Sequence, residues 1–477
     1  MKTSVKVVSL TLALSGCTNF IPEYSQPEFP VSNNWPVNEL GYEEAQPLNW
    51  RAFVNNTDLQ TLVEMSLENN KDLNEALLNI VRAEAQLGLS RATRYPSIGL
   101  DASSANQRLS ENFTGGDSSI SRTQNLNIGL SSYELDFWGR VYSLEQQALE
   151  DYLATIEGRR NTQITLISNV IQAYLTLESD RRLLALAKET LISQQNSLKL
   201  TQTSFENGVA SGLDVAQAKT TVATSRVDVA RFTSQVNVDI NALNLLVGAP
   251  IPDELLPNSE QGTEFRSLSV GLPSQILLNR PDVLQAEHQL KAANANIGAA
   301  RAAYFPTISL TTSGGLLSAD LDDLFSGDSR SWIFTPSISL PIFDWDARAR
   351  NSDIAATDQK IAVNNYQRAI QTAFQEVADA LSNQATFDDQ IEGQQMLVDA
   401  YEESFRLSEL RFNEGVDDYF NVLDSQRSYY SAQQTLITTE LSAQLNTVSL
   451  YKALGAGWDP EDVPVPLTED MYQGLDN

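Results

Sequence analysis

Cys17 is the residue whose sequence surroundings most clearly prescribe a chemical reaction. It is the only cysteine in the chain, and it directly follows Leu14-Ser15-Gly16. Two lysines and the apolar run Val7 to Leu14 lie upstream, and this run is far shorter than the roughly 20 residues of a membrane-spanning helix. Such a start is typical of a cleavable signal. We predict a signal peptide over residues 1–16 and acylation of Cys17 by diacylglycerol and palmitate. The alternative is a plain secretory signal with an incidental cysteine.

The other reactive side chains do not form an arrangement typical of an enzyme. His288 is the only histidine, and it lies in a helical stretch with no metal-ligating residue four positions further on. The carboxylate pairs Asp322-Asp323 and Asp417-Asp418 fall in expected loops or turns, where acidic side chains are usually solvated. Neither a phosphate-binding glycine loop nor a nucleophile elbow occurs in the sequence. We expect no catalysis, no cofactor and no metal ion.

The charge balance argues against one class of partner. The chain has 61 acidic and 32 basic residues, which gives a formal net charge of −29. Binding to nucleic acid requires many basic side chains, because these neutralise the phosphates. We therefore expect no nucleic acid partner.

A long internal repeat organises the chain. Residues 82–100 reappear at 292–310, and residues 205–209 reappear at 412–416. A repeat of about 200 residues is too long for a solenoid unit, whose period is roughly 20 to 50 residues. The sequence therefore predicts two similar structural halves.

Each half contains two segments with the alternation of β-strands. In the first half, Ile98, Leu100 and Ala102 alternate with small or polar residues, and a second alternating run follows a polar loop that contains glycine. The second half repeats this pattern. We predict β-hairpins over residues 96–137 and 305–344.

Helical periodicity accounts for most of the remaining chain. Apolar residues at helical spacing predict shorter helices over 57–95 and 276–304. They also predict very long helices with shorter partners, as coiled-coil pairs over 138–247 and 345–454. The long helices would reach roughly 100 Å at 1.5 Å per residue, which exceeds any ordinary globular core.

Less regular segments connect these elements. Residues 17–56 are rich in proline and asparagine, which indicates an extended segment. We expect Thr57 or Asp58 to cap the helix that follows. A linker is expected over 248–275, and a C-terminal segment over 455–477.

The strands predict an oligomer in a membrane. Each is about ten residues long with one apolar face, which suits a transmembrane β-strand. Four strands cannot close into a barrel, and open edges in lipid would leave backbone groups unpaired. Two or more copies are therefore required, and three would give 12 strands. The alternative is a periplasmic coiled-coil protein with small β-hairpins.

Aromatic residues near the strand ends have two possible roles. Trp138, Trp332 and Trp345 lie where interfacial aromatic girdles occur in membrane barrels. They could equally be core residues at the corners between strands and helices.

The chain resembles the TolC-like outer-membrane factors, and most closely their OprM-like efflux lipoproteins. The similarity covers nearly all of the chain, and its most specific stretches are Asn279-Arg280-Pro281-Asp282-Val283, Gly415 to Arg427 and Leu450-Tyr451-Lys452-Ala453-Leu454-Gly455. The resemblance implies a mixed α and β fold that forms a homotrimer. Its 12-stranded transmembrane β-barrel, with four strands per chain, would be continuous with a long α-helical periplasmic barrel. The linker and the terminal segments would form an equatorial belt.

The resemblance also implies a function. Family members are passive exit ducts of tripartite efflux pumps for drugs or other small toxic compounds. They dock a periplasmic adaptor, or membrane fusion, protein, which links them to an inner-membrane transporter of the RND or MFS type. By resemblance to bacterial lipoproteins, Thr18 after the acylated cysteine implies sorting to the outer membrane and its lipid. The alternatives are a type I protein-secretion exit channel and a non-conducting periplasmic coiled-coil lipoprotein.

Motif positions imply the site residues. Phe420 falls at the periplasmic constriction, where the family has an aliphatic residue, and Asp424 falls at an inward acidic ring. Rings of these residues would close the path by dewetting and would concentrate negative charge. The alternative is that Asp424 is one of many solvated acids. The tips implied to contact the adaptor contain Gly208, Val209, Ala210, Gly415 and Val416.

Overall fold

The computed structural model describes residues 19–35, 49–110, 112, 119–258, 262–266 and 274–456. The predicted signal peptide, Cys17, most of the predicted C-terminal segment and parts of the linker lie outside the described residues. The chain divides into two compact units. Unit 1 comprises Met1–Glu28, Ile80–Thr155 and Gln285–Tyr366, and unit 2 comprises Phe29–Asn79, Ile156–Leu284 and Gln367–Asn477.

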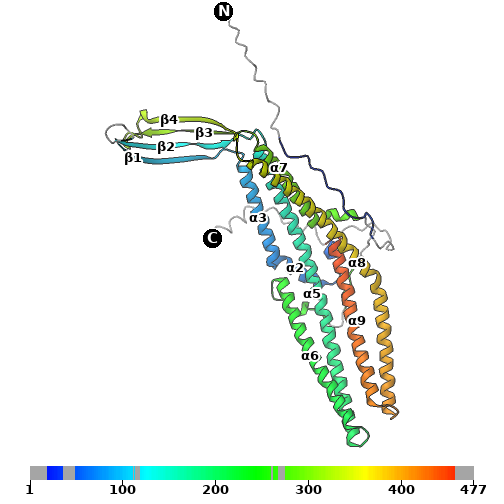
Figure 1. Ribbon diagram of the computed structural model, residues 1–477. Helices are drawn as coiled ribbons and strands as arrows, with labels where there is room; N and C mark the ends of the chain where they lie inside the picture. The colour runs from blue at the N-terminus through cyan, green and yellow to red at the C-terminus, as the bar shows by residue number, and fades with distance from the viewer. Residues whose placement is uncertain are drawn as a thin grey trace, which may run out of the picture. The chain divides into compact units, whose positions relative to one another are not determined.

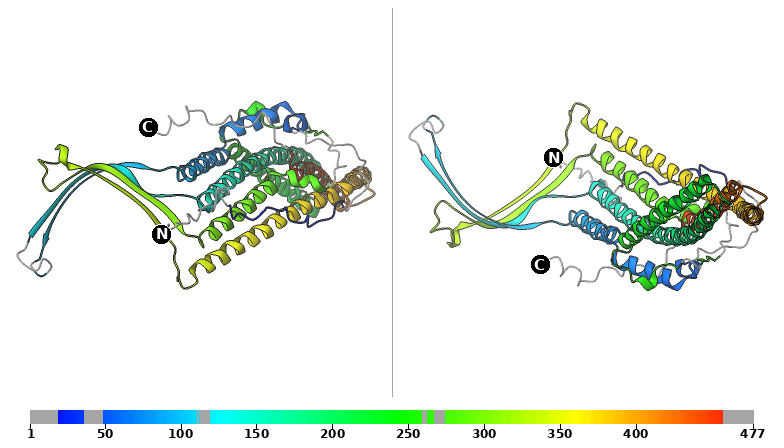
Figure 2. Two further views of the ribbon diagram at one scale, coloured as in Figure 1. Left: turned by 90° about the horizontal axis from the view of Figure 1, so that it is seen from above. Right: turned by 90° about the horizontal axis from the view of Figure 1, so that it is seen from below.

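The described residues of unit 1 contain a four-stranded antiparallel sheet (Figure 1). Its strands are β1 (Ile98–Leu109), β2 (Ser119–Glu134), β3 (Thr307–Ser318) and β4 (Arg330–Ser339). They pair in chain order, and they twist along their length (Figure 2). The hairpins lie where the alternation predicts them, although β2 is longer than expected, with 16 residues.

The strand register separates the sheet into two faces of different chemistry. The apolar face contains Ile98, Leu100, Ala102, Leu126, Ile128, Leu130, Ile308, Leu310, Leu316, Trp332, Phe334 and Ile338, with Arg108, Arg122 and Arg330 as charged exceptions near the loop ends of the strands. The polar face contains Gly99, Asp101, Ser103, Asn125, Asn127, Gly129, Ser309, Thr311, Ser313, Gly315, Ser331, Thr335 and Ser337, with Ala105, Leu317 and Ile333 as apolar exceptions. Large side chains of the apolar face are uncovered by the described chain: Leu100 is 71% exposed and Trp332 is 80% exposed.

The order of the strands leaves two edges. β1 and β4 are the outer strands, and each pairs with one neighbour within the described residues. The N–H and C=O groups on the outer side of each edge therefore have no ladder partner there.

A bulge in β2 changes which face the end of the strand presents. The register with β3 shifts between Leu130 and Tyr133, where Ser132 adopts a φ of 55°. Glu134 then lies opposite Ser309, on the polar face. Its carboxylate accepts a hydrogen bond from Arg140 Nε at 2.8 Å, so this charge is paired.

The helices follow the predicted order. They are α1 (Trp50–Phe53), α2 (Thr57–Asn69), α3 (Lys71–Ala92), α5 (Arg140–Glu206), α6 (Gly212–Val247), α7 (Pro281–Ala302), α8 (Ala347–Asn413) and α9 (Tyr419–Ala453), with 3-10 turns η1 (Asp253–Leu255), η2 (Ser274–Asn279) and η3 (Gly327–Ser329). The stretch 57–95 contains two helices, because Asn70 is extended, with ψ of 131°. None of the described helices combines the length and the apolar character needed to cross a membrane.

The cap of α2 also differs from the expectation. Asn56, rather than Thr57 or Asp58, is the capping residue, and its side chain accepts hydrogen bonds from the N–H groups of Asp58 and Leu59. Thr57 and Asp58 lie one and two positions after the cap, inside the first turn, and the N–H of Asp58 is itself one of the capped donors.

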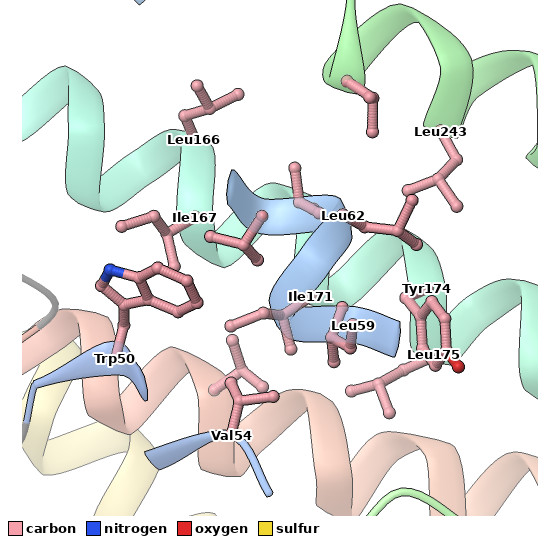
Figure 3. Close-up of a cluster of buried hydrophobic side chains, with 14 of the residues drawn as sticks. Trp50, Val54, Leu59, Leu62, Leu166, Ile167, Ile171, Tyr174, Leu175 and Leu243 are labelled. Atoms are coloured by element: carbon pink, nitrogen blue, oxygen red, sulfur yellow. The ribbon is translucent and has the colours of Figure 1, made fainter. Parts of the chain in front are cut away.

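The main core of unit 2 gathers side chains from helices that are distant in sequence (Figure 3). Leu59 and Leu62 of α2 pack among Ile167 and Ile171 of α5 and Leu243 of α6, and these five side chains are almost completely buried. Burying each stabilises the fold by about 1.5–3 kcal/mol. Phe53 of α1 also stacks on Tyr451 of α9, with ring centroids 4.0 Å apart.

The repeat places equivalent polar contacts at two joints in unit 2. Asn70 Nδ2 donates to the carbonyl of Leu246 at 2.9 Å, and Arg280 Nη1 donates to the carbonyl of Ala453 at 2.6 Å. Arg280 is 5% exposed, and it also donates to Asp282 and Glu376. Each joint thus supplies a partner to a carbonyl in the last turn of a shorter helix.

A left-handed glycine completes each joint. Gly248 and Gly455 adopt φ values of 75° and 72°. A Cβ at Gly248 would lie 2.7 Å from the carbonyl oxygen of Asn69, and a Cβ at Gly455 would lie 2.9 Å from Arg280 Cγ. These positions therefore require glycine for both conformation and space.

Two carboxyl groups meet between α5 and α6 in unit 2. Asp239 is 8% exposed, and its Oδ1 accepts a hydrogen bond from Gln235 Nε2 at 3.0 Å. Burial, followed by a hydrogen bond with Asp239, raises the pKa of Asp180 to about 7. A neutral Asp180 carboxyl reduces the repulsion between these two acids where the helices pack.

We predict that Gly248→Ala destabilises the protein more than Gly208→Ala. Both glycines have positive φ, which costs a residue with a Cβ about 1–2 kcal/mol. Only Gly248 also faces a backbone contact, since nothing lies within 4 Å of a Cβ built at Gly208. Thermal unfolding followed by circular dichroism should show the larger drop in midpoint for Gly248→Ala. Equal drops would contradict the contact argument.

Candidate functional site

Two turns between helices end the long hairpins of unit 2 in the same way. Helix α5 turns into α6 at Gly208, and α8 turns into α9 at Gly415, with φ values of 74° and 72°. The N–H after each glycine donates to the carbonyl five residues earlier, at 2.8 Å for Val209 and 2.9 Å for Val416. The backbone of the turn is therefore repeated in both halves.

The side chains that close the two turns differ. At the first turn, the Ser211 N–H donates to Asp214 Oδ2 at 2.7 Å and the Asp214 N–H donates to Ser211 Oγ at 3.2 Å, forming a capping box that Ser-x-x-Asp indicates in sequence. At the second, Arg411 Nε and Nη2 donate to Asp417 at 2.6 and 2.9 Å. The Arg411 guanidinium holds the pKa of Asp417 below its ordinary value. Sequence reasoning missed this pair, because it closes a loop rather than matching a helical spacing.

Apolar side chains are exposed at both turns. Val209 is 83% exposed and Val416 is 61% exposed, while Ala210 is half-buried and both glycines are exposed. Exposed valines of this kind, beside a backbone turn closed by hydrogen bonds, are suited to contact with another protein.

The two predicted gate residues lie together on one uncovered face of α9. Phe420 is 60% exposed, and Asp424, one turn further along, is also exposed. No ion pair joins Asp424 to another residue in the described part of the chain. The equivalent positions in the first half are Leu213, which is 65% exposed, and Gln217. The aromatic and acidic combination thus occurs at one of the two tips.

The opposite face of this turn of α9 is buried in a small hydrophobic core. Tyr419, Val422 and Leu423 are buried with Ala218 of α6. The rings of Tyr419 and Phe412 lie 5.1 Å apart. Burial raises the pKa of Tyr419. This core, which sequence reasoning did not single out, fixes the direction in which Phe420 and Asp424 point.

The three predicted interfacial tryptophans have different surroundings in unit 1. Trp138 Nε1 donates to the carbonyl of Pro306 at 2.8 Å, and its ring stacks on Phe305 at 4.8 Å. It is therefore packed at a corner between strand and helix. Trp332 and Trp345 are 80% and 85% exposed. These two remain predicted girdle residues.

His288 lies beside a carboxylate in unit 1. Its Nδ1 is 2.7 Å from Glu150 Oε2, and both side chains are largely buried. This contact joins α7 to α5 and is typical of a histidine with a structural role.

Comparison with known proteins agrees with this arrangement. The sequence profile of the outer membrane efflux protein family matches residues 62–249 and 272–456. The chain is 43% identical over 467 residues to the probable efflux pump outer membrane protein TtgC of Pseudomonas putida, covering 96% of each chain. It is 42% identical over 467 residues to the toluene efflux pump outer membrane protein TtgC of another strain, again covering 96% of each.

A solved structure gives the same result. The open state of the MtrE outer membrane channel of Neisseria gonorrhoeae superposes with a TM-score of 0.82 at 34% identity, covering 92% of this chain and 98% of that one. The family profile and the identities extend over almost the entire described chain. This chain belongs to the outer membrane efflux protein family.

Proposed function

We propose that three copies of this chain form the outer-membrane duct of a tripartite efflux pump. The observation that carries the proposal is the sheet of unit 1, with an uncovered apolar face and two edges without ladder partners. Lipid suits the apolar face, whereas the edges need strands from other copies. Barrels in membranes have at least about eight strands, so that one chain is insufficient and three give 12.

Membership of the efflux protein family supports the assignment of the other pump components. Its members are efflux channels rather than enzymes, and a pump component of the outer membrane requires partners that reach the inner membrane. We assign the partners as a periplasmic adaptor protein and an inner-membrane transporter of the RND or MFS type. The exposed valines at the turns, Val209 and Val416, with Gly208, Ala210 and Gly415, are the surface we assign to the adaptor.

The cargo is a small toxic compound. One relative is named for toluene efflux, which supports an apolar or amphipathic substrate class for this chain. The duct is passive, because energy enters through the inner-membrane transporter.

Phe420 and Asp424 form the gate at the periplasmic end. Both are uncovered within the chain, and the packed cluster of Tyr419, Val422 and Leu423 behind them directs both toward one side of α9. Around a threefold axis, the three phenyl rings would form an apolar constriction and the three carboxylates would attract cations, including divalent ones.

An acyl anchor on Cys17 holds the N-terminus at the membrane. One acylated cysteine strengthens membrane association without contributing to the pore.

The purified protein should behave as a trimer and conduct ions. We expect a trimeric mass in detergent and cation-selective single-channel currents in planar bilayers, since the chain is strongly acidic. A monomer without conductance would refute the proposed function.

Asp424→Ala should raise the conductance of the resting channel by about twofold or more, because it removes the carboxylates that hold cations at the constriction. Asp388→Ala, which changes another acid on α8 of unit 2, is the matched control for net charge. If both variants conduct like the parent protein, Asp424 has no part in the gate.

Cys17→Ser should abolish acylation, because a hydroxyl does not accept the diacylglycerol in the lipoprotein pathway. Metabolic labelling with palmitate checks this. Label that persists on the variant would argue against Cys17 as the anchor.

A further inference from the structure

The polar face of the sheet carries very little charge. Within the described strand residues of this face, the charged side chains are Asp101 and Glu134. Glu134 is bound by Arg140 at the helix end of the sheet. Asp101 is exposed, and it makes no ion pair with another described residue. The polar face therefore has one charge, Asp101, that is not paired with any residue of the described chain.

The surroundings of Asp101 fix the direction of its side chain. Its Oδ2 lies 3.9 Å from a Cβ built at Gly99, two residues earlier, so the carboxylate leans over the same face as Gly99. Directly across the ladder is Asn127, whose Oδ1 lies over Gly315 in the position that a Cβ would occupy. Gly99 therefore leaves space beside the Asp101 carboxylate, whereas the space at Gly315 is filled by Asn127.

Two amide oxygens near Asp101 have no hydrogen-bond donor among the described residues. Asn127 Oδ1, in the same row, and Asn125 Oδ1, opposite Ser103, are both buried. Carboxylate and amide oxygens are the groups with which proteins attract hard cations. Of these oxygens, the exposed carboxylate of Asp101 is the one that can face a cation in water, and no cationic side chain of the described residues forms an ion pair with it.

The depth of this row lies within the apolar band. The adjacent row contains Leu100 and Ile128, which point to the opposite face and are 71% and 58% exposed. If these residues face lipid, Asp101 faces the interior at the depth of the hydrocarbon. Walls of low dielectric focus the field of a charge into the water beside it.

We propose that Asp101 determines the cation preference of the membrane-spanning part of the duct. This inference rests on the proposed function, because it requires the polar face to line a water-filled lumen. Each subunit contributes one carboxylate at the same depth, separate from Asp424, which lies on a helix of unit 2. The ring favours cations, including cationic organic molecules, and disfavours anions of the same size.

The first test replaces the charge with an isosteric amide. Asp101→Asn should lower the ratio of potassium to chloride permeability, measured as the reversal potential in a KCl gradient, by at least about twofold. Because the side-chain volume is nearly unchanged, the conductance at high salt should stay close to that of the parent protein. An unchanged reversal potential would overturn the proposal.

The second test asks both which face of the sheet lines the lumen and whether charge at position 101 changes the selectivity. Asp101→Cys, reacted with a membrane-impermeant anionic methanethiosulfonate, should regain cation preference, and the cationic reagent should reverse it. The matched control is Leu100→Cys, one residue away on the opposite face, where neither reagent should alter the current. The unsubstituted protein controls for Cys17, its only cysteine.

The outcomes separate this inference from the proposed function. If the parent protein forms no channel, the proposed function fails. If the parent conducts but the reagents act at Leu100→Cys and not at Asp101→Cys, the assignment of faces is inverted and the Asp101 proposal fails alone. If the reagents reach Asp101→Cys without shifting the reversal potential, selectivity is set elsewhere.

Discussion

The two unpaired edges of the sheet are the constraint on which the rest of the structure depends. In water, their N–H and C=O groups could bond to solvent, but in hydrocarbon each unsatisfied group costs several kcal/mol. The linear order β1-β2-β3-β4 provides no way to pair the outer edges within the described chain. The apolar face, in contrast, is more stable in lipid than in water. Pairing the edges requires further strands, and the apolar face requires lipid, so both must be present together.

Duplication provides a common backbone, and side chains then distinguish its copies. Both hairpin turns use a left-handed glycine and the same backbone hydrogen bond, but one is closed by Ser211 and Asp214 and the other by Arg411 and Asp417. Beyond the turns, one copy presents Leu213 and the other presents Phe420. The halves therefore share geometry but differ in chemistry, and this difference is the basis for proposing docking at both tips and a gate at only one.

Local signals in the sequence predicted the elements, whereas contacts across the fold decided the details. Alternation around Leu100 and Leu126 indicated the hairpins, because a sheet with one apolar face has a period of two. The bulge at Ser132, which places Glu134 on the polar face, has no such signal. Nor did helical spacing reveal that Asp180 and Asp239 meet, since they belong to different helices. The resemblance to family motifs predicted Phe420 and Asp424 as gate residues. The packing of Tyr419 behind them was found only in the structure.

The joint at Arg280 has a consequence for how the two halves can change. Its counterpart in the first half, Asn70, binds its carbonyl as a neutral amide, whereas Arg280 is a buried cation that also engages Asp282 and Glu376. Asp282 lies two residues from Arg280, whereas Glu376 belongs to a different helix, α8, so one of the two counter-ions comes from a separate stretch of sequence. A recombinant that carries Arg280 without Glu376 would leave this buried cation with one counter-ion instead of two. Exchange of segments between the halves is therefore least disruptive when Arg280 and α8 are kept together.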